Sequence, residues 1–381
     1  MNILLSCQTV KYPLTGIGRY TLNLYHGLQE HKYISQLICI PNISKCKKNV
    51  IKKKYIFLCQ LKRIIKEFPG SYTTLNYYRK IKYTYNTYSL INKKFVYHEP
   101  CYVLKPYLGP KICTIHDLSH IHYPESHPKE RVKFLLRYLP TTINTADHII
   151  TGSEFIRQEL INLCNVSSDK VTTIHHGISK VFKVRSVNQF NFVLSRYGLN
   201  GKTYLLSVGT LEPRKNLERL IYAFKKLPEH QRVKFPLVIV GVQGWKTCHL
   251  KKLVQSLIIK GQIYILGYVI EYDLPYLYSG AYGFIYLSIY EGFGFPILEA
   301  LASGIPTLAS NISSIPEIVD NSAILCNPFN VDEITIKIKY LLDDINWREK
   351  LKISGPKQAE KFSLSTFIEK TIDVYRKISV L

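Results

Sequence analysis

The sequence predicts two α/β domains, each a parallel β-sheet covered by helices on both faces. Its 381 residues are enough for two domains, each with its own hydrophobic core. Short apolar runs alternate with helical segments through both halves, which is the pattern of strands joined by crossover helices. Residues 283–310 show this pattern most clearly, because they read as strand, loop, helix and strand.

In this central stretch, residues 283–290 are apolar and β-rich, which is typical of a buried parallel strand. Gly292 and Gly294 allow a sharp turn and a close approach of a ligand to the backbone. Pro296 suits the first turn of the helix that follows. Residues 305–309 return as the next strand.

Two carboxylates flank this loop. Glu291 follows the strand directly, and Glu299 lies eight residues later, in the first helical turns. Ligands of open α/β sheets bind at the carboxyl ends of strands, and the N-terminus of a helix favours an anion. The alternatives are a solvated helix residue for Glu299 and a purely conformational role for the glycines. The functional reading predicts an anion-binding loop.

The first domain begins with a short strand at residues 2–5. The loop after it contains Gly16 and Gly18, and the spacing of residues 20–28 is helical. A glycine-rich turn between strand and helix can present N–H groups to an anion. A single G-x-G is equally well explained by the turn alone.

Strands are expected at residues 94–97 and 111–115, and the second runs into His116 and Asp117. A histidine at the end of a strand is suited to substrate binding or to acid–base chemistry. The alternative is a structural histidine fixed by Asp117.

A strand at residues 146–151 leads to Ser153, which we expect to cap the helix that follows. A strand at residues 171–174 completes the first domain, and the polar residues 180–198 are the expected linker.

The second domain begins with a strand that ends at Gly209. Arg214 and Lys215 follow at the start of a helix, where they form a cationic clamp suited to a diphosphate. The alternative is a pair of ordinary surface cations. Further strands are expected at 236–241 and 263–267, with helices at 332–342, 347–361 and 363–378.

The charge is strongly positive and uneven. The net charge is +24, and residues 1–185 hold 28 Lys and Arg against 10 Asp and Glu, a net charge of +18. Such a domain attracts nucleic acid, anionic lipid or phosphorylated substrates. An AT-rich coding sequence rich in lysine codons is the alternative. The basic segment 44–66 fits either an anionic membrane surface or a core helix with a solvated basic face.

Several features are absent from the sequence. No run reaches the roughly 18 apolar residues of a membrane-spanning helix, and the start lacks the order of a signal peptide. The nine cysteines contain no C-x2-C pair, which favours reduced thiols in a cytoplasmic setting and argues against zinc. We expect no metal site.

The central stretch resembles a known family. Residues 291–299 read E-G-F-G-F-P-I-L-E, which is similar to the E-x7-E signature of retaining glycosyltransferases of family 4. Residues 300–311 resemble the family's continuation. G-T-L-E-P-R-K-N at 209–216, T-I-H-D-L-S at 114–119 and G-I-G-R-Y at 16–20 resemble it too. The resemblance covers nearly the whole chain and is weakest between residues 40 and 95.

This resemblance implies the GT-B fold, with two Rossmann-like domains that face a central cleft. Residues 1–185 would form the acceptor domain, residues 186–362 the nucleotide-sugar domain, and residues 363–381 a helix that returns to the first domain. The implied reaction transfers a hexose, with retention, to a glycan, glycoprotein or lipid-linked acceptor. The absence of Asp-x-Asp argues against a metal-dependent enzyme.

GDP-mannose is the donor that the motifs favour, with a UDP- or dTDP-sugar as the alternative. No other cofactor is implied. By resemblance, the catalytic residues are His116, Glu291, Arg214 and Lys215. The donor-binding residues are Gly16, Gly18, Ser153, Gly209, Arg214, Lys215, Gly267, Tyr268, Glu291, Gly292, Phe293, Gly294, Phe295, Pro296 and Glu299. Arg214 and Lys215 would stabilise the leaving diphosphate, while Glu299 would hold the ribose.

Three rival functions remain from the sequence. A glycoside hydrolase could use Glu291 and Glu299 as its carboxylate pair, although Arg214 and Lys215 argue against it. A nucleic-acid-binding protein would explain the charge, but no such motif is present, so we expect no nucleic-acid partner. A sugar-nucleotide binder without turnover would retain the cationic clamp. The expected location is the cytoplasm, with contact to an anionic membrane through the basic first domain as a possibility.

Overall fold

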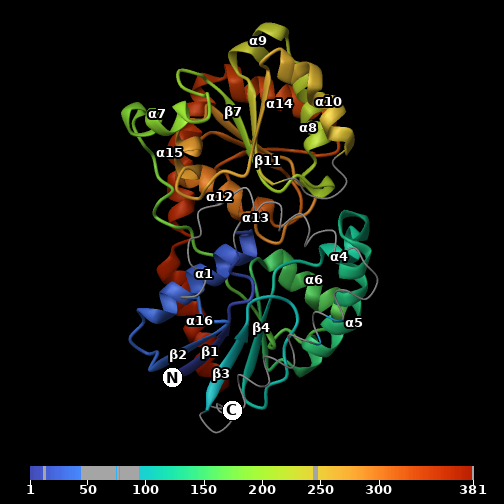
Figure 1. The fold of residues 1–381 in the computed structure, drawn as a ribbon, viewed down its shortest axis with the longest axis vertical. Helices are drawn as coiled ribbons and strands as arrows, with labels where there is room; N and C mark the ends of the chain where they lie inside the picture. Colours follow the sequence, from blue (N-terminus) through green and yellow to red (C-terminus); the bar gives the residue numbers. More distant parts are fainter. Residues whose placement is uncertain (12–13, 44–73, 75–76, 78–93, 243–247, 380–381) are drawn as a thin grey trace. The chain divides into compact units, whose positions relative to one another are not determined.

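The computed structural model describes residues 1–11, 14–43, 74, 77, 94–242 and 248–379. The chain divides into two compact units: Met1–Gly177 with Leu364–Leu381, and Ile178–Ser363. Each unit contains one six-stranded parallel sheet with helices on both faces (Figure 1). The basic segment 44–66 lies outside the described residues.

The sheet of the first unit has the strand order β2-β1-β3-β4-β5-β6. From β1 the chain adds β2 on one side of the sheet and then β3 to β6 on the other side. The strand order therefore reverses between β1 and β3. The carboxyl ends of strands at such a reversal form the usual ligand site of this architecture. The strands are β1 (Asn2–Ser6), β2 (Gln36–Ile40), β3 (Phe95–Glu99), β4 (Lys111–Ile115), β5 (His148–Thr151) and β6 (Val171–Thr173).

Two groups of helices cover the two faces of this sheet (Figure 1). Helices α1 and α16 pack together on one face, while α5 and α6 cover the other. Helix α1 begins at Gly16, earlier than the sequence predicted, because the Thr15 side chain accepts the N–H of Gly18 and caps it. The helices are α1 (Gly16–Gln29), α4 (Ser119–His122), α5 (Lys129–Thr145), α6 (Glu154–Cys164) and α16 (Leu364–Ser379), with a 3-10 turn η3 (Pro124–Ser126).

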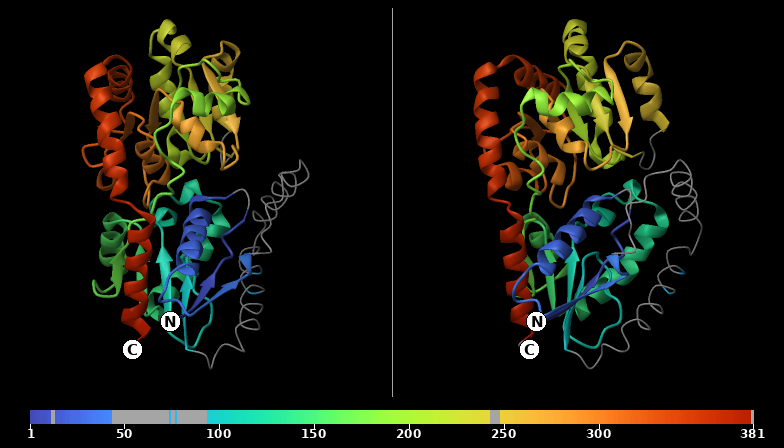
Figure 2. Two further views of the ribbon diagram at one scale, coloured as in Figure 1. Left: turned by 90° about the vertical axis from the view of Figure 1, so that its left-hand side faces the viewer. Right: turned by 60° about the vertical axis from the view of Figure 1, so that its left-hand side comes forward.

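The last helix of the chain is built into the first unit. Figure 2 shows α16, in red, running alongside the sheet of that unit. The Tyr375 hydroxyl lies 2.6 Å from Nδ1 of His98, whose Nε2 lies 2.8 Å from the hydroxyl of Thr114. The Thr114 hydroxyl in turn lies 2.9 Å from that of Tyr20. This buried chain of hydrogen bonds joins α16 to β3, β4 and α1.

Burial keeps His98 neutral. It lowers the pKa of His98 from 6.5 to about 3, with a smaller effect from His116. The unfolded chain therefore binds a proton on this histidine at a higher pH than the folded chain does. Folding stability should fall as the pH drops from about 6.5 towards 3.

The sheet of the second unit has the order β12-β11-β10-β7-β8-β9, which reverses between β7 and β10. Its strands are β7 (Leu205–Val208), β8 (Leu237–Val240), β9 (Ile263–Gly267), β10 (Gly283–Tyr286), β11 (Thr307–Ser310) and β12 (Ile324–Cys326). Strand β10 ends at Tyr286, four residues before the predicted end. Beyond it, the N–H of Ile289 donates to the carbonyl of Arg214, so these residues join a loop rather than the sheet.

Two hydrophobic cores lie on the two faces of this second sheet. One contains buried residues of α11, α12 and α13, and the other contains those of α8, α10 and α14. Neighbouring residues of β7 alternate between them: Leu206 belongs to the first core and Leu205 to the second. The helices are α7 (Val187–Ser195), α8 (Leu217–Lys225), α9 (Glu229–Lys234), α10 (Cys248–Ile259), α11 (Leu274–Ser279), α12 (Phe295–Ala302), α13 (Ile315–Val319), α14 (Val331–Asp343) and α15 (Ile345–Glu360), with a 3-10 turn η4 (Pro213–Lys215).

The expected linker at residues 180–198 contains helix α7, and the chain divides earlier, between Gly177 and Ile178. The polar composition that favoured a linker belongs to a surface helix. Ser186 forms a capping box with Gln189 at its start, while Val193 and Leu194 are buried.

The described residues bear on the expectations about membrane-spanning helices and about cysteines. Among them, no helix is both long and apolar enough to cross a membrane. Six cysteines of the described part are free thiols.

The buried contact between Tyr375 and His98 gives a test of how α16 is held. The Tyr375→Phe variant leaves Nδ1 of His98 buried without this partner. We expect the free energy of unfolding to fall by about 1–3 kcal/mol, measured by urea denaturation. Tyr340→Phe is a matched control, because Tyr340 is 49% exposed, and it should change stability by less than about 0.5 kcal/mol. Equal losses in both variants would contradict this account.

Candidate functional site

The candidate site lies at the carboxyl ends of β7 and β10, where the strand order of the second unit reverses. The turn η4 after β7 supplies Arg214 and Lys215, and the loop after β10 supplies Glu291. These residues are 76 and 77 positions apart in the chain. The fold brings together the residues that the sequence nominated separately.

The two Nη atoms of Arg214 donate to three acceptors. Its Nη1 donates to the carbonyl of Tyr290 at 2.6 Å and to Oε2 of Glu291 at 3.1 Å. Its Nη2 donates to Oε1 of Glu212 at 2.7 Å. The guanidinium therefore ties the turn after β7 to the loop after β10, so Arg214 is not an ordinary surface cation.

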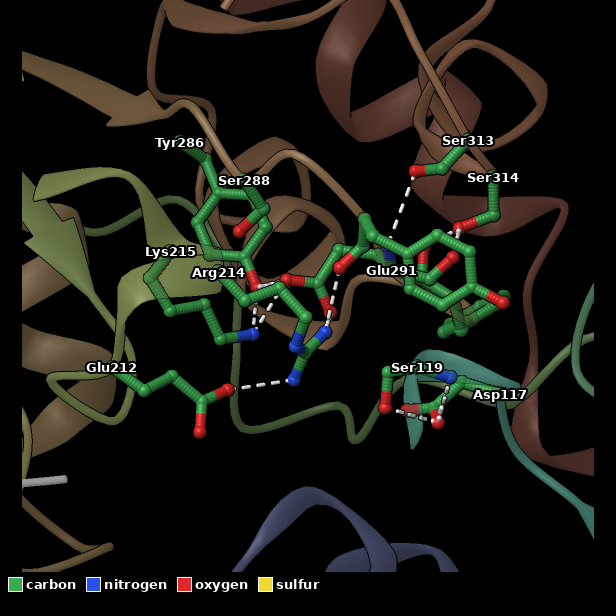
Figure 3. A network of polar contacts seen from close by, with 12 residues as sticks. Asp117, Ser119, Glu212, Arg214, Lys215, Tyr286, Ser288, Glu291, Ser313 and Ser314 are labelled. Carbon is green, nitrogen blue, oxygen red and sulfur yellow. Dashed lines mark hydrogen bonds and ion pairs between the residues drawn. The ribbon is translucent and has the colours of Figure 1, made fainter. Parts of the chain in front are cut away.

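Lys215, Tyr286 and Glu291 form a closed triangle of hydrogen bonds (Figure 3). The Lys215 ammonium donates to Oε1 of Glu291 at 2.5 Å and to the Tyr286 hydroxyl at 2.9 Å. The Tyr286 hydroxyl donates to the same Oε1 at 2.7 Å. One carboxylate thus accepts from two cationic side chains and a phenol.

The two cations hold Glu291 in its ionised form. Burial raises the pKa of Glu291, but the charges of Lys215 and Arg214 outweigh burial and lower it from 4.5 to about 2. Glu212 supplies a second carboxylate to Arg214. Two cations and two carboxylates therefore face one another, and their charges balance.

Two serines hold the backbone of the glycine-rich loop. Ser313 accepts the N–H of Glu291 at 3.1 Å, and Ser314 donates to the carbonyls of Glu291 and Phe293 at 2.9 and 3.1 Å. Ser313 has a φ of +57°, a conformation that favours glycine. Strained residues of this kind persist where the surrounding contacts fix them, and they concentrate at functional sites.

The rest of the loop leads into α12 as predicted. Gly294 has a φ of +109° and precedes the helix, and Pro296 lies in its first turn. The positive φ at Gly294 explains the second glycine of the motif. Gly292, Phe293 and Phe295 complete this passage, and Glu299 follows in α12, where it is 1% exposed. Glu299 is therefore not a solvated surface residue.

Three glycines lie at the carboxyl ends of β7, β8 and β9, which follow one another in the sheet. The N–H of Gly209 donates to the carbonyl of Val240, and that of Gly241 donates to the carbonyl of Gly267. A Cβ at Gly241 would lie 1.8 Å from the Gly209 carbonyl oxygen, so only glycine fits there. Gly267 has a φ of +68° and is followed by Tyr268. Gly209, Gly267 and Tyr268 were expected from the sequence, whereas the steric constraint on Gly241 was not.

In the first unit, His116 lies at the end of β4 and is largely buried. Its Nε2 donates to the carbonyl of Pro100 at 2.7 Å, and burial lowers its pKa. Asp117 instead accepts from Tyr102 and Ser119. The alternative of a histidine fixed by Asp117 names the wrong partner, because the backbone carbonyl of Pro100 fixes the ring.

The other nominated residues of the first unit have local roles. Ser153 is fully buried and caps α6 by accepting the N–H of Ile156 at 3.3 Å. Gly16 and Gly18 lie in the first turn of α1. A Cβ at Gly18 would lie 2.9 Å from the carbonyl oxygen of Thr9, which explains the need for glycine there.

A buried ion pair at the strand reversal of the first unit was not predicted from the sequence. Lys105 pairs with Glu99, the last residue of β3, and also donates to Ser6, the last residue of β1, at 3.3 Å. Tyr97 donates to the same carboxylate at 2.8 Å. Tyr286 and Ser313 were likewise not predicted. Their residue types and spacing match no motif, so only the folded chain identifies them.

Metal ligation finds no support in the part of the chain that the structure describes. No group of three or more His, Cys, Asp or Glu side chains there is arranged to hold an ion. The nominated carboxylate Glu291 is occupied by cationic side chains instead.

Comparison with known proteins gives matches along the whole chain. The family of glycosyl transferases group 1 matches residues 195–358, and glycosyltransferase family 4 matches residues 14–180. O-antigen chain mannosyltransferase B of Escherichia coli is 35% identical, over 99% of this chain and 100% of that protein.

Solved structures show the same fold. A glycosyltransferase from Rickettsia africae superimposes with a TM-score of 0.70 at 18% identity, over 99% of this chain and 98% of that one. Anabaena HepE, in complex with UDP and glucose, does so with a TM-score of 0.69 at 14% identity, over 99% of both chains. These likenesses confirm the predicted GT-B fold with its two Rossmann-like sheets.

The positive φ of Ser313 predicts that glycine is more stable than alanine at this position, whereas alanine is more stable than glycine at an ordinary helical position. Ser313→Gly and Ser313→Ala both remove the hydroxyl, but only alanine keeps a Cβ at positive φ. We expect Ser313→Gly to be more stable than Ser313→Ala by about 1 kcal/mol in urea denaturation. At the exposed helical Ser256 the order should reverse, with alanine more stable than glycine by about 1 kcal/mol. The same order at both positions would contradict the assignment of strain to Ser313.

Proposed function

Because this chain belongs to glycosyltransferase family 4, we propose that it transfers mannose from GDP-mannose to a hydroxyl group of a glycan or lipid-linked acceptor. The observation that carries the choice of mannose is the 35% identity to O-antigen chain mannosyltransferase B, over the full length of both proteins.

Arg214 and Lys215 are the proposed diphosphate site. Negative charge grows on the β-phosphate as the bond to the sugar breaks, and cationic donors fixed beforehand lower the energy of that state. In the free protein their hydrogen bonds go to Glu291 and Glu212. Phosphate oxygens would take over part of these contacts, assisted by the N–H groups of residues 292–295 and the N-terminus of α12.

When phosphate oxygens take over part of the hydrogen bonds of Arg214 and Lys215, Glu291 is partly released, and this release gives it its proposed role. A carboxylate that shares its cations with the diphosphate has oxygens available for the hydroxyls of the donor sugar. Its low pKa keeps it an acceptor of hydrogen bonds at neutral pH. Glu299 is proposed to hold the ribose hydroxyls, and His116 to contact the sugar through the ring nitrogen that Pro100 leaves available.

The proposed chemistry retains the configuration of the sugar. The acceptor oxygen forms a bond to the anomeric carbon on the face from which the diphosphate departs. The departing phosphate oxygen takes the acceptor's proton, so no protein nucleophile is required. Arg214 and Lys215 supply the positive charge that a divalent ion supplies in metal-dependent enzymes, and we therefore propose metal-independent transfer.

A glycoside hydrolase is the less suitable reading of the carboxylates. Glu291 cannot be its general acid, because its pKa is lowered to about 2, and it is poorly suited as the nucleophile, because Arg214 and Lys215 donate to both of its carboxylate oxygens. We propose a cytoplasmic enzyme, supported by the free thiols of the described part. The net charge of +18 in residues 1–185 would attract the phosphates of an anionic membrane or of the substrates.

A donor screen by thermal shift tests the proposed ligand. We expect GDP-mannose to raise the melting temperature more than GDP-fucose, UDP-glucose, UDP-GlcNAc or dTDP-rhamnose, because a ligand of the folded state stabilises it by mass action. At a concentration about 100 times Kd the gain is about 2.7 kcal/mol, which amounts to a few degrees.

The Lys215→Ala variant should lose this shift. Lys260→Ala is the control, because Lys260 is exposed and paired with Glu229 on the surface, and it should keep the shift. A shift with oligonucleotides and with none of the nucleotide sugars would overturn the transferase proposal.

The mechanism is tested by transfer in the presence of excess EDTA. We expect the rate of mannose transfer from GDP-mannose to an oligosaccharide acceptor to stay within about twofold of the rate with Mg²⁺. The proton NMR spectrum of the product should show an α-linked mannose, as in the donor. Loss of activity that Mg²⁺ restores would contradict metal-independent transfer, and a β-linked product would contradict retention.

A further inference from the structure

The Tyr286 hydroxyl lies between the two charged groups of the site (Figure 3). It is 2.9 Å from the Lys215 ammonium and 2.7 Å from Oε1 of Glu291. The proposed function assigns Lys215 to the diphosphate and Glu291 to the sugar. No motif in the sequence points to Tyr286.

The phenol is held in place by the sheet and the core. Tyr286 is the last residue of β10, pairs with Ala309 of β11 and is 3% exposed. Its ring is stacked on that of Phe284, with centroids 6.0 Å apart. The backbone of the sheet and the core therefore fix the position of the hydroxyl.

Lys215, by contrast, carries its charge on four flexible methylenes. Its ammonium lies 5.3 Å from the centroid of the Tyr286 ring and bonds to the hydroxyl of that ring. The fixed phenol therefore selects one of the many conformations that this side chain could adopt.

The direction of the hydrogen bonds is also defined. An ammonium only donates and a carboxylate only accepts, so the phenol accepts from Lys215 and donates its single proton to Glu291. Burial, followed by the charge of Glu291, raises the pKa of Tyr286 well above 10, so it keeps that proton. The triangle is complete only with a hydroxyl at this position.

We propose that Tyr286 is a positioning residue for sugar transfer, which fixes the Lys215 ammonium and the Glu291 carboxylate where the diphosphate and the donor sugar meet them. The inference rests on the proposed function of this site. A displacement of about 1 Å in such groups can lower turnover a hundredfold while the donor still binds.

Tyr286→Phe tests the proposal, because it removes one oxygen and keeps the ring. We expect kcat to fall by about tenfold or more, with KM for GDP-mannose changed by less than about threefold. Tyr204→Phe is the matched control: the Tyr204 hydroxyl is buried and donates to the carbonyl of Leu277 at 2.7 Å, away from these charges. It should lower the melting temperature and leave kcat unchanged.

A double-mutant cycle with Glu291→Gln separates positioning from a direct contact with the substrate. If Tyr286 acts through Glu291, adding Tyr286→Phe to the Glu291→Gln variant should lower kcat by less than about threefold, and a second cycle with Lys215→Gln tests action through the ammonium in the same way. Where steady-state turnover is too slow to follow, the single-turnover rate with excess enzyme replaces kcat in both cycles. Fully additive effects in both cycles would overturn the inference.

The outcomes distinguish this inference from the proposed function. If the wild-type protein transfers mannose and Tyr286→Phe does so with the same kcat, the inference alone is overturned. If the wild-type protein neither transfers a sugar nor binds a nucleoside diphosphate, the proposed function is overturned and the inference with it.

Discussion

The structure of the second unit depends on one buried interaction, in which the Glu291 carboxylate accepts hydrogen bonds from Arg214 and Lys215. A buried charge without a partner costs several kcal/mol, so these groups hold the turn after β7 and the loop after β10 against each other. The backbone reinforces the contact, because the Arg214 guanidinium and carbonyl both bond to that loop. The reversal of strand order makes the two strand ends neighbours. It therefore creates the place where the charges can meet.

The first unit uses polar contacts in a comparable way at its own strand reversal. The pair of Glu99 and Lys105 joins the ends of β1 and β3, and His98 joins β3 and β4 to the last helix. Burial keeps His98 neutral, so this part of the core is held by hydrogen bonds and not by charge. The same backbone plan thus carries a charged centre in one unit and, in the other, both an ion pair and a neutral network.

Much of the fold could be predicted from local patterns, because buried parallel strands are short apolar runs and helix starts carry their capping residues. Strand β10 and helix α12 were predicted this way, as was the cap of α6 by Ser153. Helix α5 was not predicted, and it contains Pro140, although proline normally ends a helix. The end of β10 was misplaced because Leu287 and Ile289 are as apolar as the strand itself. Only the competing contact with the Arg214 carbonyl decides where pairing stops.

The sequence by itself determined the two-sheet architecture, the family and the nomination of Arg214, Lys215 and Glu291, because these follow from short-range patterns that survive without coordinates. The tertiary structure alone decided how those residues are used in the free protein. It pairs Glu291 with both cations and places Tyr286 between them. It also fixes His116 to the Pro100 carbonyl and not to Asp117. The physical reason is that these contacts depend on how loops and strand ends meet in the folded chain. Glu291 lies 76 and 77 positions from Lys215 and Arg214, and the nearer pairs, Tyr286 with Glu291 and His116 with Pro100, match no local pattern either.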